Sequence, residues 1–190
     1  VAATAQAMKA MAGNPSQLDV FNKVDGAVRD GLGTTFFVDA AGGTGKTFLA
    51  EALIHSAHAR GQIVLPMASS GIAALLLPGG RTAHSTCRIP VRGLDKDTTL
   101  AVTMQSGRGQ LLKRAALIIW DEAPMVHRHA LEAIERSLRL LRENTAPFGG
   151  VTFMLMGDFR QVLPVVPRGC RGQVVRASMK YSSVWQYVTQ

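Results

Sequence analysis

The sequence predicts one doubly wound α/β domain with a mostly parallel sheet. Four short apolar runs alternate with helical patterns along its 190 residues. Strands that alternate with helices are typical of parallel sheets joined by crossover helices. Three of the four runs lead directly into polar segments, at residues 40–47, 121–124 and 157–161. We therefore expect these segments to form one common site.

Composition supports a folded domain and excludes a chain that spans a membrane or one that is held together by disulfides. The chain is 47% hydrophobic and 18% charged, which suits a packed core better than disorder. No apolar run approaches the roughly 18 residues that span a bilayer, and two cysteines, Cys87 and Cys170, make no disulfide framework. The net charge of +8 favours a polyanionic partner such as nucleic acid, although a basic protein without such a partner has the same composition.

The first half of the chain contains two expected strands. Residues 1–13 form a lead-in, either helical or disordered, and the domain is placed at residues 14–190. Asn14 and Pro15 predict a helix start, with Asn14 as N-cap and Pro15 at the first helical position. We expect a helix to about residue 29, a strand at 34–39, a helix at about 46–59, a strand at 63–68, a short helix to 77 and a turn at 78–80.

The second half continues the alternation. A polar loop is expected at residues 88–99, followed by a helix around 103–114, a strand at 116–120, a helix at 127–143 and a strand at 151–156. The helix at 127–143 has an apolar stripe on one face and four arginines on the other. Beyond Pro167 the sequence is rich in Arg and Gly, and Val174 with Val175 suggests an edge strand.

Residues 40–47 (AAGGTGKT) predict a phosphate-binding loop. They follow an apolar strand, precede a helix and fit the pattern G-x-x-x-x-G-K-[ST], except that Ala40 replaces the first glycine. Lys46 would reach the β- and γ-phosphates of ATP, and the Thr47 hydroxyl would bind Mg²⁺. The alternative is a glycine-rich loop that only caps a helix. The remaining loop positions would bind phosphate through backbone N–H groups: Gly42, Gly43, Thr44 and Gly45.

Two further strand ends complete the expected site. Asp121 would hold Mg²⁺, and Glu122 would orient and deprotonate the attacking water. Gln161 would hydrogen-bond the γ-phosphate or that water. The alternative interpretation is two surface carboxylates and a simple turn. His127 and His129 are interpreted as solvated, and His84 with Cys87 offers too few ligands for a metal site.

Beyond this physical interpretation, the motifs resemble the PIF-one ("petite integration frequency") DNA helicases, superfamily-one motors of the RecD-like branch, and above all the module found in Helitron transposons. The resemblance covers residues 14–185. Its segments are NPSQ at 14–17, the loop at 40–47, ASSGIAA at 68–74, GRTAHS at 80–85, DEAPM at 121–125 and GDFRQ at 157–161.

The resemblance implies a RecA-like P-loop NTPase domain that uses ATP and Mg²⁺ to move 5′ to 3′ on DNA. It implies that Gln17 reads the adenine, and that single-stranded DNA lies along Ser69, Ser70, Thr82 and His84. Phe159 either stacks a base or packs in the core. Family members act on DNA junctions in repair, recombination and telomere maintenance, so we expect a nuclear or alternatively mitochondrial protein.

The family's later motifs lie in a second RecA-like domain, and the chain ends before them. Because it also begins with Val1, we expect it to be part of a longer protein. We expect weak ATP hydrolysis and no unwinding without the second domain. A truncated or degenerate module that binds nucleotide or DNA without turnover is the alternative, and an unrelated P-loop enzyme such as a small-molecule kinase is a third. The sequence does not predict the oligomeric state.

Overall fold

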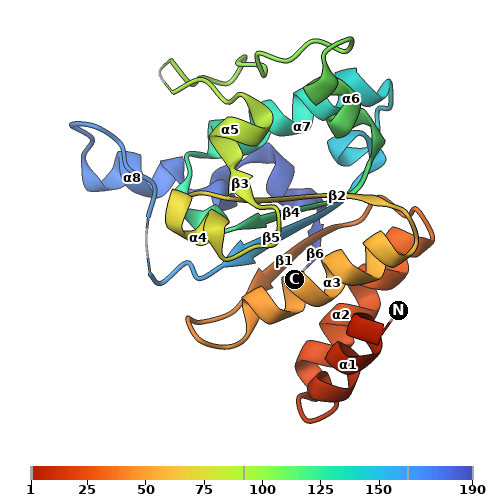
Figure 1. Cartoon of the computed structure of the whole chain (residues 1–190). Coiled ribbons are helices and arrows are strands. Elements are labelled where there is room, and N and C mark those ends of the chain that lie inside the picture. The colour runs from red at the N-terminus through yellow and green to blue at the C-terminus, as the bar shows by residue number, and fades with distance from the viewer. Residues whose placement is uncertain (1, 92, 162, 190) are drawn as a thin grey trace.

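A computed structural model describes residues 2–91, 93–161 and 163–189. It contains a six-stranded, entirely parallel sheet in the order β3-β2-β4-β5-β1-β6. Helices cover both faces of the sheet (Figure 1), so the predicted doubly wound α/β fold is confirmed. The strands are β1 (Thr35–Asp39), β2 (Ile63–Ala68), β3 (Arg81–Thr82), β4 (Ala115–Asp121), β5 (Thr152–Gly157) and β6 (Val188–Thr189).

One face of the sheet is covered by the N-terminal helices. Asn14 caps α2 by accepting the N–H of Gln17, and Pro15 stands at its first turn, as predicted. Met11, at the end of α1, is fully buried against this layer, so the lead-in is helical rather than disordered. The helices of this face are α1 (Ala2–Met11), α2 (Pro15–Arg29) and α3 (Lys46–Ala59).

The other face carries shorter elements and one long amphipathic helix. The predicted stripe of α7, Leu131, Ile134, Leu138 and Leu141, is buried against the sheet. Arg142, on the same helix, donates to the carbonyls of Lys113, Ala115 and Gly149 and so ties α7 to the start of β4. The elements on this side are α5 (Ala83–Cys87), α6 (Gly107–Arg114), η1 (Ala123–Met125), α7 (Arg128–Arg142) and η2 (Pro147–Gly150). The short helix α4 (Gly71–Leu75) leads instead to Leu77, which is buried in the cluster of the N-terminal helices.

Two sequence predictions about the elements were wrong. Val174 and Val175 lie in a helix, α8 (Arg171–Ala177), and the edge strand is β6, reached through η3 (Met179–Tyr181) and η4 (Ser183–Tyr187). A β-branched pair favours a strand only where a neighbouring strand is present to pair with it. The helix expected at 103–114 begins only at Gly107, because Ser106 accepts the Gly109 N–H and caps it there.

Candidate nucleotide and DNA site

The phosphate loop joins the end of β1 to the start of α3. Gly43 and Gly45 have φ of 75° and 87°, a left-handed conformation that other residues rarely adopt. Gly42 does not have a left-handed conformation. A Cβ at position 42 would lie 3.3 Å from Nε2 of Gln161, so glycine at this position leaves room for the Gln161 side chain. Lys46 Nζ donates to the carbonyls of Ala40 and Ala41 at 2.7 and 2.8 Å, which holds the ammonium group over the loop.

Gln17 lies against this loop although 28 residues separate it from Gly45. Its Nε2 donates to the Gly45 carbonyl at 3.0 Å, and a Cβ on Gly45 would come within 2.8 Å of the same nitrogen. A cavity of about 220 Å³ opens beside them, with Val20, Val38 and Thr44 in its lining. The Gln17 side chain therefore borders both the loop and a partly apolar cavity, which suits the expected contact with a purine.

Asp121 and Glu122 stand at the end of β4. Asp121 is only 4% exposed, and burial raises the pKa of its carboxyl while Lys46 opposes the shift. Burial, and then the charge of Asp121, raises the pKa of Glu122. Glu122 has φ of 52°, a strained conformation that marks functional sites in many proteins. Its N–H donates to Oδ1 of Asp121 at 2.9 Å.

Ser69 supports that strained backbone, a role that the sequence did not suggest. Its hydroxyl donates to the Glu122 carbonyl at 2.6 Å and accepts from Nε1 of the buried Trp120 at 3.0 Å. Because its single O–H is used internally, Ser69 has the least left to donate among the four predicted DNA contacts. In the sequence, the one signal for the contact between Ser69 and Glu122 is the position of this serine directly after β2, the strand beside β4.

The third motif lies between the two others. Its Asp158 accepts hydrogen bonds from the side chain and backbone N–H of Arg160, and these lower the pKa of the Asp158 carboxyl. Gln161 is exposed beside Gly42 of the phosphate loop. Gly157 packs on Pro124, since a Cβ at position 157 would lie 2.4 Å from Cδ of that proline. The three predicted segments thus meet at one end of the sheet.

Two of the expected DNA contacts are helix caps. Ser70 accepts the N–H of Ala73, and Thr82 accepts the N–H of Ser85, each at 3.2 Å. Each hydroxyl keeps its own hydrogen for donation to a phosphate. His84 lies half-buried on α5. Phe159 packs with its ring centroid 4.8 Å from that of Phe37, which supports core packing over base stacking.

The expectation that His127 and His129 are solvated was wrong. Both are half-buried, because the ring nitrogen Nδ1 of His127 accepts the His129 N–H and caps α7. Nδ1 of His129 also lies 2.8 Å from the Glu132 carboxylate. Across the ranges that the structure describes, no three His, Cys, Asp or Glu side chains gather as metal ligands. Cys87 is buried and Cys170 exposed.

The residues present fit a magnesium nucleotide. The left-handed loop and the N-terminus of a 14-residue helix present N–H groups and positive charge, which bind phosphate. Mg²⁺ prefers oxygen ligands and retains several from water or phosphate. The chain offers two, the Thr47 hydroxyl and the buried Asp121 carboxylate. In the described part of the chain, no salt bridge neutralises Asp121.

Comparison with known proteins identifies the family. Residues 13–190 match the family model described as PIF1-like helicase. The chain belongs to the PIF1-like helicase family. One relative, the "ATP-dependent DNA helicase Pif1" of Psychrobacter, is 35% identical over 141 residues, which are 72% of this chain and 21% of the relative. The PIF1 helicase of Homo sapiens is 27% identical over 168 residues, 83% of this chain and 26% of the relative.

Solved PIF1-like structures have the same architecture. Pif1 from Bacteroides in complex with ADP-AlF3 and ssDNA superposes with a TM-score of 0.72 at 29% identity, over 88% of this chain and 39% of that one. Pif1 from Candida albicans superposes with a TM-score of 0.65 at 27% identity, over 89% of this chain and 38% of that one. This PIF1-like chain spans only about a fifth to a quarter of the length of the curated relatives above. The RecA-like fold predicted from the sequence is confirmed.

Proposed function

We propose that this chain is the ATP-hydrolysing motor domain of a 5′-to-3′ DNA helicase, which works with a second RecA-like domain. The observation that carries the proposal is the acid pair. Asp121 is buried at the end of β4, Glu122 directly after it has a strained backbone, and the charge of Lys46 influences the pKa of both. Glycine-rich loops that only cap helices need no such pair.

Each polar group then has a separate task. Thr47 and Asp121 would hold Mg²⁺, which when bound neutralises charge on the phosphates. Lys46 contacts the β- and γ-phosphates. Glu122, whose pKa is raised by burial and by the charge of Asp121, accepts a proton from the attacking water. Gln161, beside the loop, orients that water or the terminal phosphate.

DNA is the proposed second substrate. The chain carries a net charge of +8, and a PIF1-like relative of known structure was solved with ssDNA. Ser70, Thr82 and His84 would contact its backbone, with Ser69 as a backbone neighbour. By family resemblance we propose action on junctions in repair, recombination and telomere maintenance, in the nucleus or alternatively the mitochondrion. In the described part of the chain, no helix is long and apolar enough to cross a membrane.

The test measures ATP hydrolysis with and without single-stranded DNA, for this chain and for a longer one that continues through a second RecA-like domain. We expect DNA-stimulated turnover in the longer chain and little in this one. Lys46→Ala should lower turnover by about 100-fold or more, the usual loss when one donor that stabilises transition-state charge is removed. Lys9→Ala, at an exposed lysine on α1, is the control and should change nothing.

Three results would contradict the proposal. Nucleotide binding without turnover in both chains would identify a degenerate module that only binds. Turnover by the longer chain that DNA does not change would point instead to a P-loop enzyme with another substrate. Strand separation by the present chain alone would show that the second domain is not required.

A further inference from the structure

A second pocket lies at the outer edge of the sheet, away from the phosphate loop. Its volume is about 240 Å³, and β2, β3, α5 and α6 supply its lining. Ligand pockets for drug-sized molecules begin at roughly 300 Å³, so this one suits a single small group. Its lining includes Leu65, Pro66, Arg81, Thr86, Arg108 and Leu111.

The pocket exists because the edge of the sheet is incomplete. β3 pairs with β2 at two positions, Arg81 with Met67 and Thr82 with Ala68, so none of the described residues pairs with the outer edge of β2 from Ile63 to Pro66. The Ser69 N–H donates toward β4, and alternation along the strand turns position 66 to the open side. Because Pro66 has no N–H, an added peptide strand would lack a donor at the centre of this edge.

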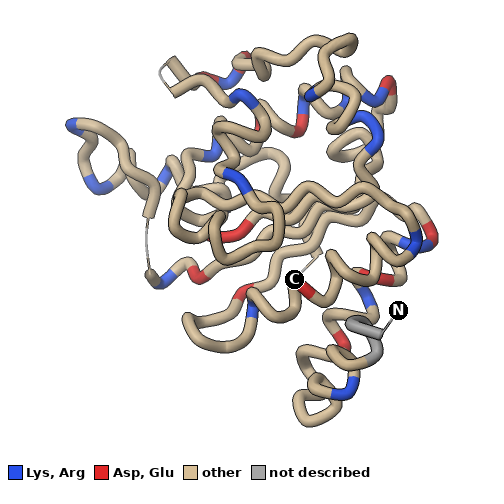
Figure 2. The backbone as a smooth tube through the Cα atoms, in the orientation of Figure 1, with Lys and Arg blue, Asp and Glu red and all other residues tan. Residues whose placement is uncertain are grey.

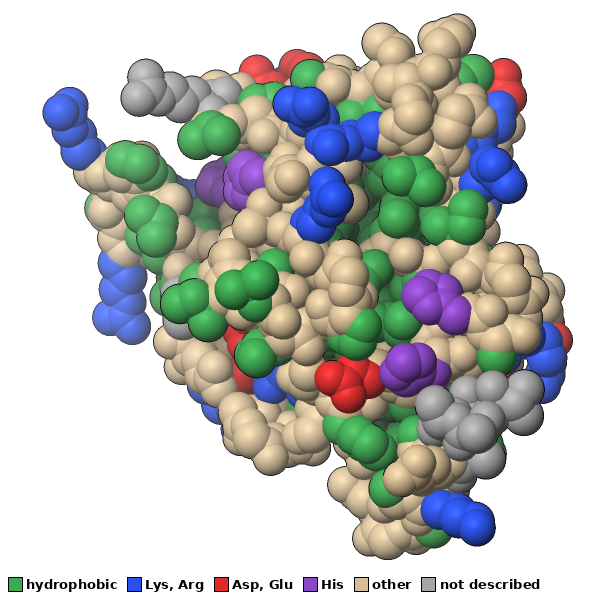
Figure 3. Space-filling view, in the orientation of Figure 1, with side chains coloured by type: hydrophobic (Ala, Val, Ile, Leu, Met, Phe, Trp, Pro, Cys, Tyr) green, Lys and Arg blue, Asp and Glu red, His purple; other side chains and the backbone are tan. Residues whose placement is uncertain are grey.

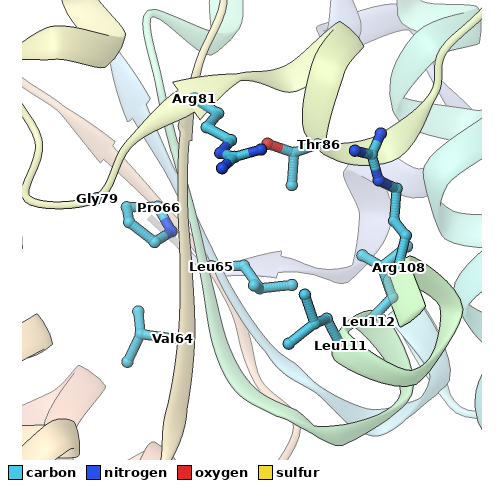
Figure 4. Close-up of a pocket in the computed structure, with 9 residues that line it drawn as sticks. All are labelled: Val64, Leu65, Pro66, Gly79, Arg81, Thr86, Arg108, Leu111 and Leu112. Carbon is cyan, nitrogen blue, oxygen red and sulfur yellow. The ribbon is translucent and has the colours of Figure 1, made fainter.

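Two arginines border the pocket over an apolar floor. Figure 4 shows the Arg81 guanidinium turned toward the Thr86 hydroxyl, with Arg108 beyond it and Leu65 and Leu111 below. Leu111 is 49% exposed. In the space-filling view, hydrophobic side chains occupy a recess beneath a group of Lys and Arg on this face (Figure 3).

Neither arginine is neutralised by the described residues. No salt bridge involves Arg81 or Arg108. Arg108 donates to the Ser85 carbonyl of α5, which fixes its position and leaves other N–H groups of its five free. The site therefore offers two guanidinium groups to an anion directly beside exposed apolar surface.

We propose that this pocket binds one nucleotide of the single-stranded DNA, with its phosphate between Arg81 and Arg108 and its base on Leu65 and Leu111. The inference rests on the proposed function. Arg81 and Thr86 lie in β3 and α5, the elements that also carry Thr82 and His84, so the pocket adjoins the expected track. A phosphate suits the guanidinium groups, and the flat face of the adjoining base can lie on exposed leucine.

The test compares the affinity of this chain for labelled oligothymidylate among variants that each lose one charge. Figure 2 shows Lys and Arg along much of the chain, so any such loss weakens DNA binding slightly. Arg171→Ala, at an exposed position on α8, sets that baseline. We expect Arg81→Ala to weaken binding roughly five- to tenfold beyond it, as one charge-assisted contact requires. Arg108→Lys should keep a donor to α5 and lose less DNA affinity than Arg81→Ala does.

Leu111→Ser tests the base separately from the phosphate. Because Leu111 is half exposed, the variant should fold, and circular dichroism checks this. We expect it to weaken binding of oligothymidylate about threefold, because part of the apolar surface beneath the base is lost. Binding of an abasic oligomer of the same length should not change.

The outcomes separate this inference from the proposed function. If Arg81→Ala binds DNA as Arg171→Ala does while the wild type binds well, the pocket is not a DNA contact and the proposed function stands. If neither this chain nor the longer one binds single-stranded DNA although both bind ATP, the DNA half of the proposed function fails, and the inference with it. If an acidic, leucine-containing peptide binds and only Arg81→Ala abolishes it, a protein partner occupies the pocket instead.

Discussion

At the scale of single residues, the candidate site places two carboxylates under different constraints. Asp121 is buried and has its pKa raised mainly by desolvation. Glu122 is half-buried and strained, and its pKa is raised by burial and by the adjacent charge. A raised pKa makes a carboxylate a better base, while an uncompensated buried carboxylate costs stability until a cation arrives. Each makes a separate prediction.

Glu122→Gln should bind nucleotide but hydrolyse it roughly 10²- to 10⁴-fold more slowly in the longer, DNA-stimulated chain, the usual loss for a general base. Because only the deprotonated form accepts a proton, the wild-type rate should fall on acidification through the raised Glu122 pKa, above the range of an ordinary glutamate. A kcat profile against pH measures this. Glu143→Gln, at an exposed residue on the far end of α7, is the control. A profile that stays level across the acidic range would contradict the assignment.

Asp121→Asn should stabilise the ligand-free chain and remove its response to magnesium nucleotide. The folded-state pKa lies above the unfolded value, so the penalty is present above the folded pKa and is relieved as pH falls through it. Thermal unfolding should show a higher Tm at neutral pH, by about 2–4 °C for each ~1 kcal/mol relieved. The difference from wild type should shrink in acid. An unchanged or lower Tm at neutral pH would refute the desolvation argument.

At the scale of elements, the site depends on loops that pack against one another at the ends of β1, β4 and β5. Gly157 ends β5 against Pro124 of η1, and Ser69, directly after β2, holds the Glu122 carbonyl. These contacts join segments far apart in the sequence. They make the spacing between the acid pair and the third motif rigid, which catalysis by positioned groups requires.

Gly157→Ala should destabilise the chain by about 1–3 kcal/mol, the usual cost of overpacking, because its Cβ would lie 2.4 Å from Pro124 Cδ. Urea unfolding monitored by circular dichroism measures the loss. Gly172→Ala is matched to it: position 172 lies in α8 with its nearest neighbour 3.9 Å away. The free energy of unfolding of that control should be unchanged or higher by up to about 1 kcal/mol. Equal effects of the two substitutions would show that the contact does not constrain the loop.

At the scale of the whole molecule, the N-terminal helix belongs to the domain although the family model begins at residue 13. Met11 is fully buried in the cluster that includes Phe21 and Leu53. Met11→Ala should therefore lower the free energy of unfolding by about 2–5 kcal/mol. Met8→Ala, at a residue 41% exposed, should cost far less. Nucleotide affinity measured well below each Tm should not change, and matching stabilities of the two variants would mean that α1 only rests on the surface.

The sequence by itself determined the fold class, most element bounds and the two strongest motifs of the site. β2 and α3 have the predicted bounds, Ile63–Ala68 and Lys46–Ala59, because apolar periodicity and glycine-rich stops are local signals. The loop at 40–47 and the acid pair at 121–122 were recognisable for the same reason. Their chemistry is set by adjacent residues.

Only the tertiary structure decided which side chains meet. In the folded chain Val174 and Val175 lie in a helix, and Phe159 packs on Phe37. The Ser69 hydroxyl donates to the Glu122 carbonyl, so its hydrogen is not available to DNA. It also made the pocket of Arg81 and Arg108, whose residues come from four elements. Such contacts depend on strand order and on which edge remains unpaired, and these are settled by packing across the whole sheet rather than by neighbours in the chain.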